Sequence, residues 1–130
     1  MHNNSITDTI LSGKKTLSLE FFPPKTSKGE AQFQKACYHL KELDPNFTSI
    51  TYGAGGTDRS NTAFYAKQLK EKFNYNVMPH LTCIGHSLAE LSNLLETYQR
   101  LGFKTIMALR GDIPLEQKYI RDIKGFNYAS

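Results

Sequence analysis

The chain has 130 residues, of which 39% are hydrophobic and 22% are charged, as expected for one soluble globular domain. Its 16 basic and 12 acidic residues give a net charge of +4. The basic side chains are scattered and tryptophan is absent, which argues against a nucleic-acid-binding protein. No apolar run approaches the roughly 18 residues of a membrane span, and the first four residues lack the features of a secretory signal. We therefore expect a cytoplasmic protein that contacts neither membrane nor nucleic acid.

The two cysteines, Cys37 and Cys83, lie 46 positions apart and in no metal-ligand spacing. Cys37 falls in a helical pattern and Cys83 just after a strand pattern, so both are predicted to be reduced thiols. We expect no metal site.

Strands and helices are predicted to alternate along the chain. The predicted strands cover residues 16–22, 47–51, 77–82 and 105–109. The predicted helices cover residues 27–43, 58–73 and 87–101. Ser27 with Glu30, and Ser87 with Glu90, have the spacing of a capping box at the start of the first and third helices. Residues 110–127 show no clear period and are predicted to form a long loop, with at most a short helical turn.

Each predicted helix carries one apolar stripe, which predicts one face packed on a sheet. The stripes are Phe33, Cys37, Leu40 and Leu43 in the first helix, Ala66, Leu69 and Phe73 in the second, and Leu88, Leu91, Leu95, Tyr98 and Leu101 in the third.

Strand starts near Leu17, Phe47, Val77 and Thr105 are spaced by 30, 30 and 28 residues, which predicts a parallel sheet built from βαβ units. Such units form either an open doubly wound sheet or a closed (β/α)8 barrel of TIM type. Strands buried on both faces of an open sheet are apolar throughout. In this chain alternate positions carry polar side chains instead, which favours a barrel whose interior these side chains face. The fold class predicted is therefore α/β, a parallel TIM-type barrel.

Four places at the carboxyl ends of the predicted strands could carry chemistry, since barrel enzymes work at that end. Glu20 is the one carboxylate inside a predicted strand, and its parity points inward. An apolar setting would favour its neutral form, which suits a general acid near neutral pH. A structural carboxylate paired with Arg or Lys is the alternative.

Each of the other three places also has two possible interpretations, one functional and one structural. The glycine-rich segment 51–56 either approaches a ligand closely or is a flexible turn, and it lacks the third glycine of a dinucleotide fingerprint. His80 is either a hydrogen-bonded core residue or a ligand contact. Arg110 and Asp112 either clamp a polar ligand or brace their loop as an ion pair.

Five segments together resemble the methylenetetrahydrofolate reductase family. They are LEFFPPK (19–25), ITYGAGG (50–56), PHLTC (79–83), ALRGDIP (108–114) and FNYAS (126–130), in the family's order and at similar intervals. The resemblance covers the chain from about Thr16 to its end.

The resemblance implies an FAD-dependent oxidoreductase of one-carbon and methionine metabolism. Such an enzyme reduces 5,10-methylenetetrahydrofolate to 5-methyltetrahydrofolate, with NADH or NADPH as the electron donor. By matching positions, Glu20 is the expected general acid, and Asp112 lies between flavin and pterin. The positions that match FAD contacts are Thr51, Tyr52, Ala54, His80, Arg110, Gly111, Asp112, Tyr128 and Ala129.

The resemblance also implies an incomplete barrel. A (β/α)8 barrel needs eight strands and roughly 250 residues, whereas residues 1–130 supply about the first four βα units, the amino-terminal half. Open strand edges predict association, either as a homo-oligomer or with a second chain that supplies the missing half. A non-catalytic remnant or half-barrel interaction module without flavin is the alternative function.

Overall fold

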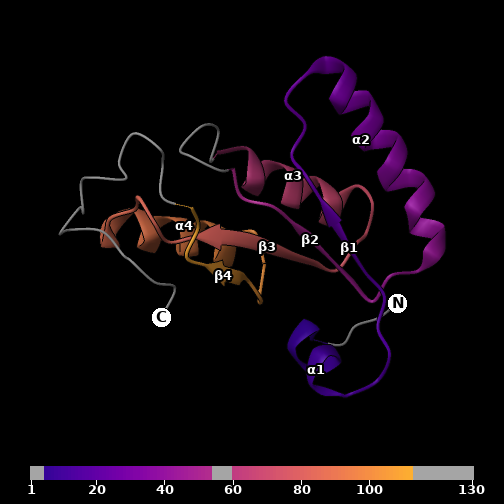
Figure 1. Ribbon diagram of the computed structural model, residues 1–130, viewed down its shortest axis with the longest axis horizontal. Helices are drawn as coiled ribbons and strands as arrows, with labels where there is room; N and C mark the ends of the chain where they lie inside the picture. Colours follow the sequence, from indigo (N-terminus) through magenta and orange to yellow (C-terminus); the bar gives the residue numbers. More distant parts are fainter. Residues whose placement is uncertain (1–4, 54–59, 113–130) are drawn as a thin grey trace.

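The computed structural model describes residues 5–53 and 60–112, and in these ranges four parallel strands pair in chain order (Figure 1). The strands are β1 (Ser18–Phe21), β2 (Phe47–Ile50), β3 (Val77–Thr82) and β4 (Met107–Leu109). The helices are α1 (Ile6–Leu11), α2 (Ser27–Leu40), α3 (Ser60–Glu71) and α4 (Leu88–Arg100), with a 3-10 turn, η1, over Lys41–Leu43. The predicted α/β class is confirmed, and the parallel order is consistent with part of a TIM barrel.

The main core lies between the sheet and helices α2, α3 and α4. Alternate strand residues Phe21, Ile50 and Leu81 are buried there, as the predicted strand parity requires. Helix residues complete the core, among them Phe33, Cys37, Ala66, Leu69, Leu91 and Tyr98. Leu17, which the alternation of polar and apolar residues in the predicted strand 16–22 placed on the same apolar side as Phe21, lies before β1 and is 43% exposed.

The opposite face of the sheet carries a smaller apolar cluster near the amino-terminal ends of the strands. Phe47 and Met78 are buried in it, Met107 packs against it, and Ile6 of α1 covers it. Accordingly, α1 lies on the other side of the strands from α2 and α3 (Figure 1). The sequence pattern did not predict α1, because six residues are too few to show a helical stripe. The remaining, polar part of this second face is called the inner face below.

Helix α2 begins at Ser27 as predicted, but its N-cap lies one residue earlier than the predicted cap. The Thr26 side chain accepts a hydrogen bond from the Gly29 amide at 3.0 Å and is the N-cap, so the capping box predicted at Ser27 is wrong. The predicted partner, Glu30, accepts from Gln34 and Tyr65 instead. The capping box of Ser87 and Glu90 at α4 is confirmed, with both reciprocal hydrogen bonds present.

Some predicted stripe residues face solvent because a helix on the outside of a sheet buries only a narrow strip. Leu43, Leu88 and Leu95 are 54%, 68% and 44% exposed, contrary to the prediction. Strand β3 has the predicted bounds, whereas β1, β2 and β4 are shorter than predicted. No helix in the described part of the chain is long and apolar enough to cross a membrane.

Candidate functional site

Three polar side chains from three neighbouring strands meet on the inner face. The strand register pairs Glu20 of β1 with Ser49 of β2, and His80 lies two residues beyond Met78, the β3 partner of Ser49. Paired residues of parallel strands share a face, so these three side chains point the same way. The Ser49 hydroxyl donates to Glu20 Oε2 at 3.4 Å, and His80 Nε2 lies 3.5 Å from the same oxygen. The structure thus brings together two of the predicted site residues and adds Ser49.

His80 has a buried nitrogen without a hydrogen bond. The residue is only 6% exposed, and its Nε2 atom has no hydrogen-bond partner in the described part of the chain. Burial lowers the pKa of His80 below its ordinary value of 6.5, and the Glu20 carboxylate opposes part of that shift. A neutral imidazole with an unused polar atom suits a ligand contact better than a fully hydrogen-bonded core histidine.

The environment of Glu20 differs from the apolar one expected. Its side chain is 49% exposed, and its partners are the polar groups of Ser49 and His80. Neither contact is an ion pair with Arg or Lys, the alternative that the sequence left open. Both contacts fall on Oε2, so in the described part of the chain Oε1 has no hydrogen-bond partner.

The end of β2 is held by contacts on several sides. The Thr51 amide donates to Phe21 O at 3.0 Å, and Thr51 O accepts from the Thr62 hydroxyl of α3 at 3.0 Å. Tyr52 is 6% exposed and joins the main core. Its hydroxyl lies 2.9 Å from His86 Nε2. Ala54 falls outside the described residues.

The segment after β4 packs against the turn after β3. Ile84 N donates to Arg110 O at 2.9 Å. Gly111 has φ +84°, and a Cβ atom there would lie 2.9 Å from Ile84 Cγ2 and 3.0 Å from Thr82 Cβ. Arg110 Nε donates to the Gly111 carbonyl at 3.3 Å rather than to Asp112, and both charged residues are exposed.

The structure does not show every predicted site residue in contact. In the described part of the chain no ion pair joins Arg110 to Asp112, and neither contacts Glu20 or His80 through a hydrogen bond or an ion pair. Tyr128 and Ala129 lie outside the described residues. A cavity of about 430 Å³ opens at the other end of the sheet, beside Ser5, Tyr75 and Lys104, and none of the predicted site residues lines it.

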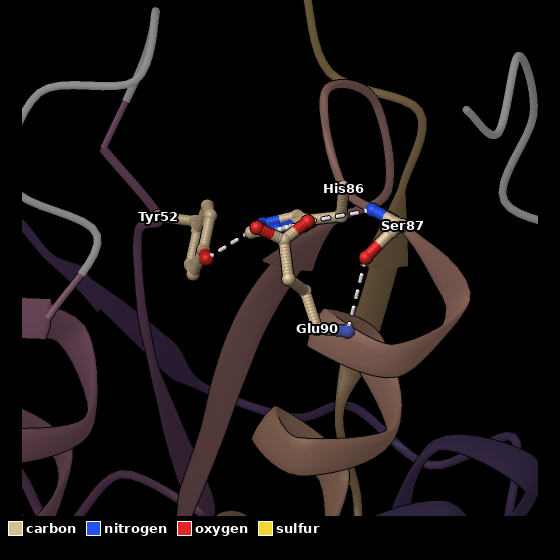
Figure 2. Close-up of polar contacts among 4 residues, drawn as sticks. All are labelled: Tyr52, His86, Ser87 and Glu90. Atoms are coloured by element: carbon tan, nitrogen blue, oxygen red, sulfur yellow. Dashed lines mark hydrogen bonds and ion pairs between the residues drawn. The ribbon is translucent and has the colours of Figure 1, made fainter. Parts of the chain in front are cut away.

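Sequence reasoning missed one polar cluster near the same end of the sheet. His86, in the turn after β3, lies between Tyr52 and Glu90, and Ser87 joins through the α4 cap (Figure 2). The spacing of His86 and Glu90, four positions apart at a predicted capping box, was the available signal.

Comparison with known proteins gives a consistent result. Residues 5–130 match the family model described as methylenetetrahydrofolate reductase. The chain is 41% identical over 106 residues to the 5,10-methylenetetrahydrofolate reductase of Pectobacterium carotovorum, covering 82% of this chain and 36% of that protein. It is 38% identical over 104 residues to the Escherichia coli protein of the same name, and this alignment covers 80% of this chain and 35% of that protein. It is 35% identical over 118 residues to methylenetetrahydrofolate reductase (NADH) 1 of Arabidopsis thaliana, and this alignment covers 90% of this chain and 20% of the plant protein.

The chain therefore spans about a third of the length of these bacterial relatives. The family match runs across both described ranges and includes every strand of the sheet. This chain belongs to the methylenetetrahydrofolate reductase family.

Proposed function

We propose that residues 1–130 form the amino-terminal half of the active site of an FAD-dependent methylenetetrahydrofolate reductase. The reaction is the reduction of 5,10-methylenetetrahydrofolate to 5-methyltetrahydrofolate with NADH or NADPH. The observation that carries the proposal is the approach of Glu20 Oε2 to His80 Nε2, at 3.5 Å on the inner face. The family match and the names of the relatives support the same reaction.

The residues present fit a flavin. The buried Nε2 of His80 has no hydrogen-bond partner in the described chain, and a polar edge of a ligand would supply one. The residues proposed to hold FAD are Thr51, Tyr52, Ala54, His80, Arg110, Gly111, Asp112, Tyr128 and Ala129. When bound, FAD would supply the hydride that converts the methylene group into a methyl group.

Glu20 is the proposed general acid. The Ser49 hydroxyl donates to Oε2, so a protonated carboxyl group would carry its proton on Oε1, which has no hydrogen-bond partner in the described chain. That oxygen can give the proton to a ring nitrogen of the folate and open its imidazolidine ring to a reactive iminium. The partial exposure of Glu20, at 49%, leaves room for a ligand to reach it.

Asp112 is the proposed electrostatic partner of the iminium. A carboxylate close to a developing cation lowers the energy of the transition state without a proton transfer. Asp112 is exposed, and Gly111 beside it has φ +84° and packs closely on Thr82 and Ile84 where the chain leaves β4.

The electron donor is proposed to be a nicotinamide dinucleotide. The relatives from Arabidopsis thaliana, Oryza sativa and Zea mays carry NADH in their names. Both NADH and NADPH are therefore to be compared as donors.

The visible spectrum of the purified chain tests the proposal. We expect bound flavin that NADH or NADPH bleaches and that methylenetetrahydrofolate reoxidises. Glu20→Gln should keep flavin and bleaching but slow the folate step by about 10²–10⁴-fold, the usual contribution of a general acid. Glu42→Gln, at an exposed carboxylate in η1, is the matched control and should change neither step. Unchanged folate turnover in Glu20→Gln would remove Glu20 from the reaction.

A second candidate function is a half-barrel interaction module that binds no flavin. The sequence left this alternative open, and the presence or absence of bound flavin decides between the two functions. A colourless chain that remains colourless when a separately expressed second half of the barrel is added would support this alternative. Colour that returns on mixing would indicate an enzyme assembled from two chains.

A further inference from the structure

His86 connects the core of the protein to an exposed carboxylate. Its Nε2 atom lies 2.9 Å from the Tyr52 hydroxyl, and its Nδ1 atom lies 3.8 Å from Glu90 Oε2 (Figure 2). The Tyr52 and His86 rings also meet edge to face, with centroids 5.9 Å apart. His86 and Tyr52 are 5% and 6% exposed, whereas the Glu90 side chain is 60% exposed.

The position of Glu90 is fixed by the start of α4. Its Oε2 atom accepts a hydrogen bond from the Ser87 amide at 2.7 Å, and the Ser87 hydroxyl accepts from the Glu90 amide at 3.3 Å. The capping box therefore holds the carboxylate beside the His86 ring. The same carboxylate oxygen therefore both caps α4 and lies near His86 Nδ1.

When the His86 ring is neutral, the charge of Glu90 favours one of the two ring nitrogens as the one that carries the proton. A carboxylate only accepts hydrogen bonds, so it favours the tautomer with hydrogen on Nδ1, the nearer nitrogen. The distance of 3.8 Å makes this an electrostatic preference rather than a hydrogen bond. Nε2 is then an acceptor, and the Tyr52 hydroxyl must donate to it.

Tyr52 is buried in the main core. Tyr98 of α4 lies near Tyr52. The pKa of Tyr98 is raised mainly by burial and to a smaller extent by the nearby Tyr52 hydroxyl. The Tyr98 hydroxyl has no hydrogen-bond partner in the described chain. Removing the His86 side chain would remove the hydrogen bond between its Nε2 atom and the Tyr52 hydroxyl, at a cost to the position of the Tyr52 ring.

The backbone beside Tyr52 leads directly to the glycine-rich segment. Thr51 is held through both its amide and its carbonyl, by Phe21 and Thr62. The bond from Tyr52 to His86 adds a side-chain anchor at the next residue. Together these contacts fix where the chain leaves β2.

We propose that His86, oriented by Glu90, is a positioning residue that holds Tyr52 and the Thr51 backbone in place for the flavin. The inference rests on the proposed function in one respect, namely that Thr51 and Tyr52 line the FAD. His86 itself touches neither flavin nor folate. It acts through the hydroxyl of Tyr52.

The tautomer is tested first, on the flavin-free chain. Nitrogen-15 NMR of labelled histidine should show His86 with an unprotonated Nε2 in the wild type. Glu90→Gln can keep the cap but places a neutral amide near Nδ1, so the Nε2 signal should shift toward the protonated form. Glu96→Gln, at an exposed carboxylate farther along α4, is the matched control and should leave the signal unchanged. A protonated Nε2 in the wild type overturns the proposed hydrogen-bond direction.

Flavin affinity is tested second, by titration of the full chain. His86→Ala should weaken flavin binding by about 10-fold, equivalent to one hydrogen bond. His86→Gln should restore most of it, because an amide oxygen can accept from the Tyr52 hydroxyl. Tyr52→Phe should lower the flavin affinity as much as His86→Ala does. The double variant should bind flavin no more weakly than either single variant. With flavin saturating, kcat of the two His86 single variants should remain near that of the wild type.

The outcomes separate this inference from the proposed function. If the wild type binds flavin and His86→Ala binds it equally well, the positioning role is refuted while the reductase assignment stands. Additive losses in the double variant would also refute it, because His86 would then act by packing alone. If the wild type binds no flavin, either alone or with a separately expressed second half of the barrel, the proposed function and the positioning role both fail, and the NMR result still decides the hydrogen-bond direction.

Discussion

Gly111 is a position where a single added methyl group should lower the stability of the fold. Its φ of +84° is left-handed, and an added Cβ would lie 2.9 Å from Ile84 Cγ2 and 3.0 Å from Thr82 Cβ. The left-handed backbone costs a non-glycine residue about 1–2 kcal/mol, and overpacking against short branched side chains adds about 1–3 kcal/mol. We expect Gly111→Ala to lower the free energy of unfolding by about 2–5 kcal/mol, a large share of the roughly 5–15 kcal/mol of a typical domain.

Gly13→Ala is the matched control. Gly13 also has a left-handed backbone, with φ +68°, but an added Cβ there meets nothing within 4 Å. It should cost only the backbone part, about 1–2 kcal/mol. Both substitutions reduce the entropy of the unfolded chain equally, so the difference between them isolates the close contact of the β4 exit with Thr82 and Ile84.

Urea unfolding followed by circular dichroism measures the difference. With a slope of about 1–2 kcal/mol per molar urea, an extra loss of about 2 kcal/mol moves the midpoint by about 1–2 M. Equal midpoints for the two variants would contradict the close packing of Gly111. A larger loss for Gly13→Ala would contradict the reasoning altogether.

Three further outcomes are expected. Thr26→Ala should destabilise the chain by about 1 kcal/mol, because it removes the α2 N-cap, while Ser27→Ala should change little; equal losses in thermal melts would contradict the observed cap. Tyr98→Phe should leave stability unchanged or raise it by about 1 kcal/mol, because its buried hydroxyl has no hydrogen-bond partner in the described chain; a clear loss in urea unfolding would reveal a partner. The free energy of unfolding should fall as the pH drops below about 6.5, since burial lowers the pKa of His80 and the unfolded chain therefore binds the proton more readily; His80→Gln should flatten that slope, and an unchanged slope would show that other groups cause it.

Local patterns predicted the regular elements well where the physical cause is local. The bounds of β3 and the cap of α4 depend on residues close together in sequence, and both were confirmed. The cap of α2 was misplaced by one residue because Thr26 and Ser27 are adjacent and both are good caps. The short α1 was missed because its six residues are too few to show a helical stripe, and its one buried residue, Ile6, packs on Phe47 and Met78, which are distant in the chain.

The candidate site was predicted in part. Strand parity placed Glu20 and His80 on one face, and the structure brings them to 3.5 Å. The polar surroundings of Glu20 depend on register with Ser49, which parity does not supply. The roles of Arg110 and Asp112 remain predictions, as do those of Ala54, Tyr128 and Ala129, which lie outside the described residues.

By itself, the sequence determined the alternation of strands and helices, the parallel α/β class and the family, because periodicity, capping and motifs are carried by neighbouring residues. Only the tertiary structure decided which side chains face each other across strands and turns. The contact of Glu20 with His80 joins residues 60 positions apart, and that of Tyr52 with His86 joins residues 34 apart. Such contacts depend on strand register and helix packing, which the whole core fixes at once.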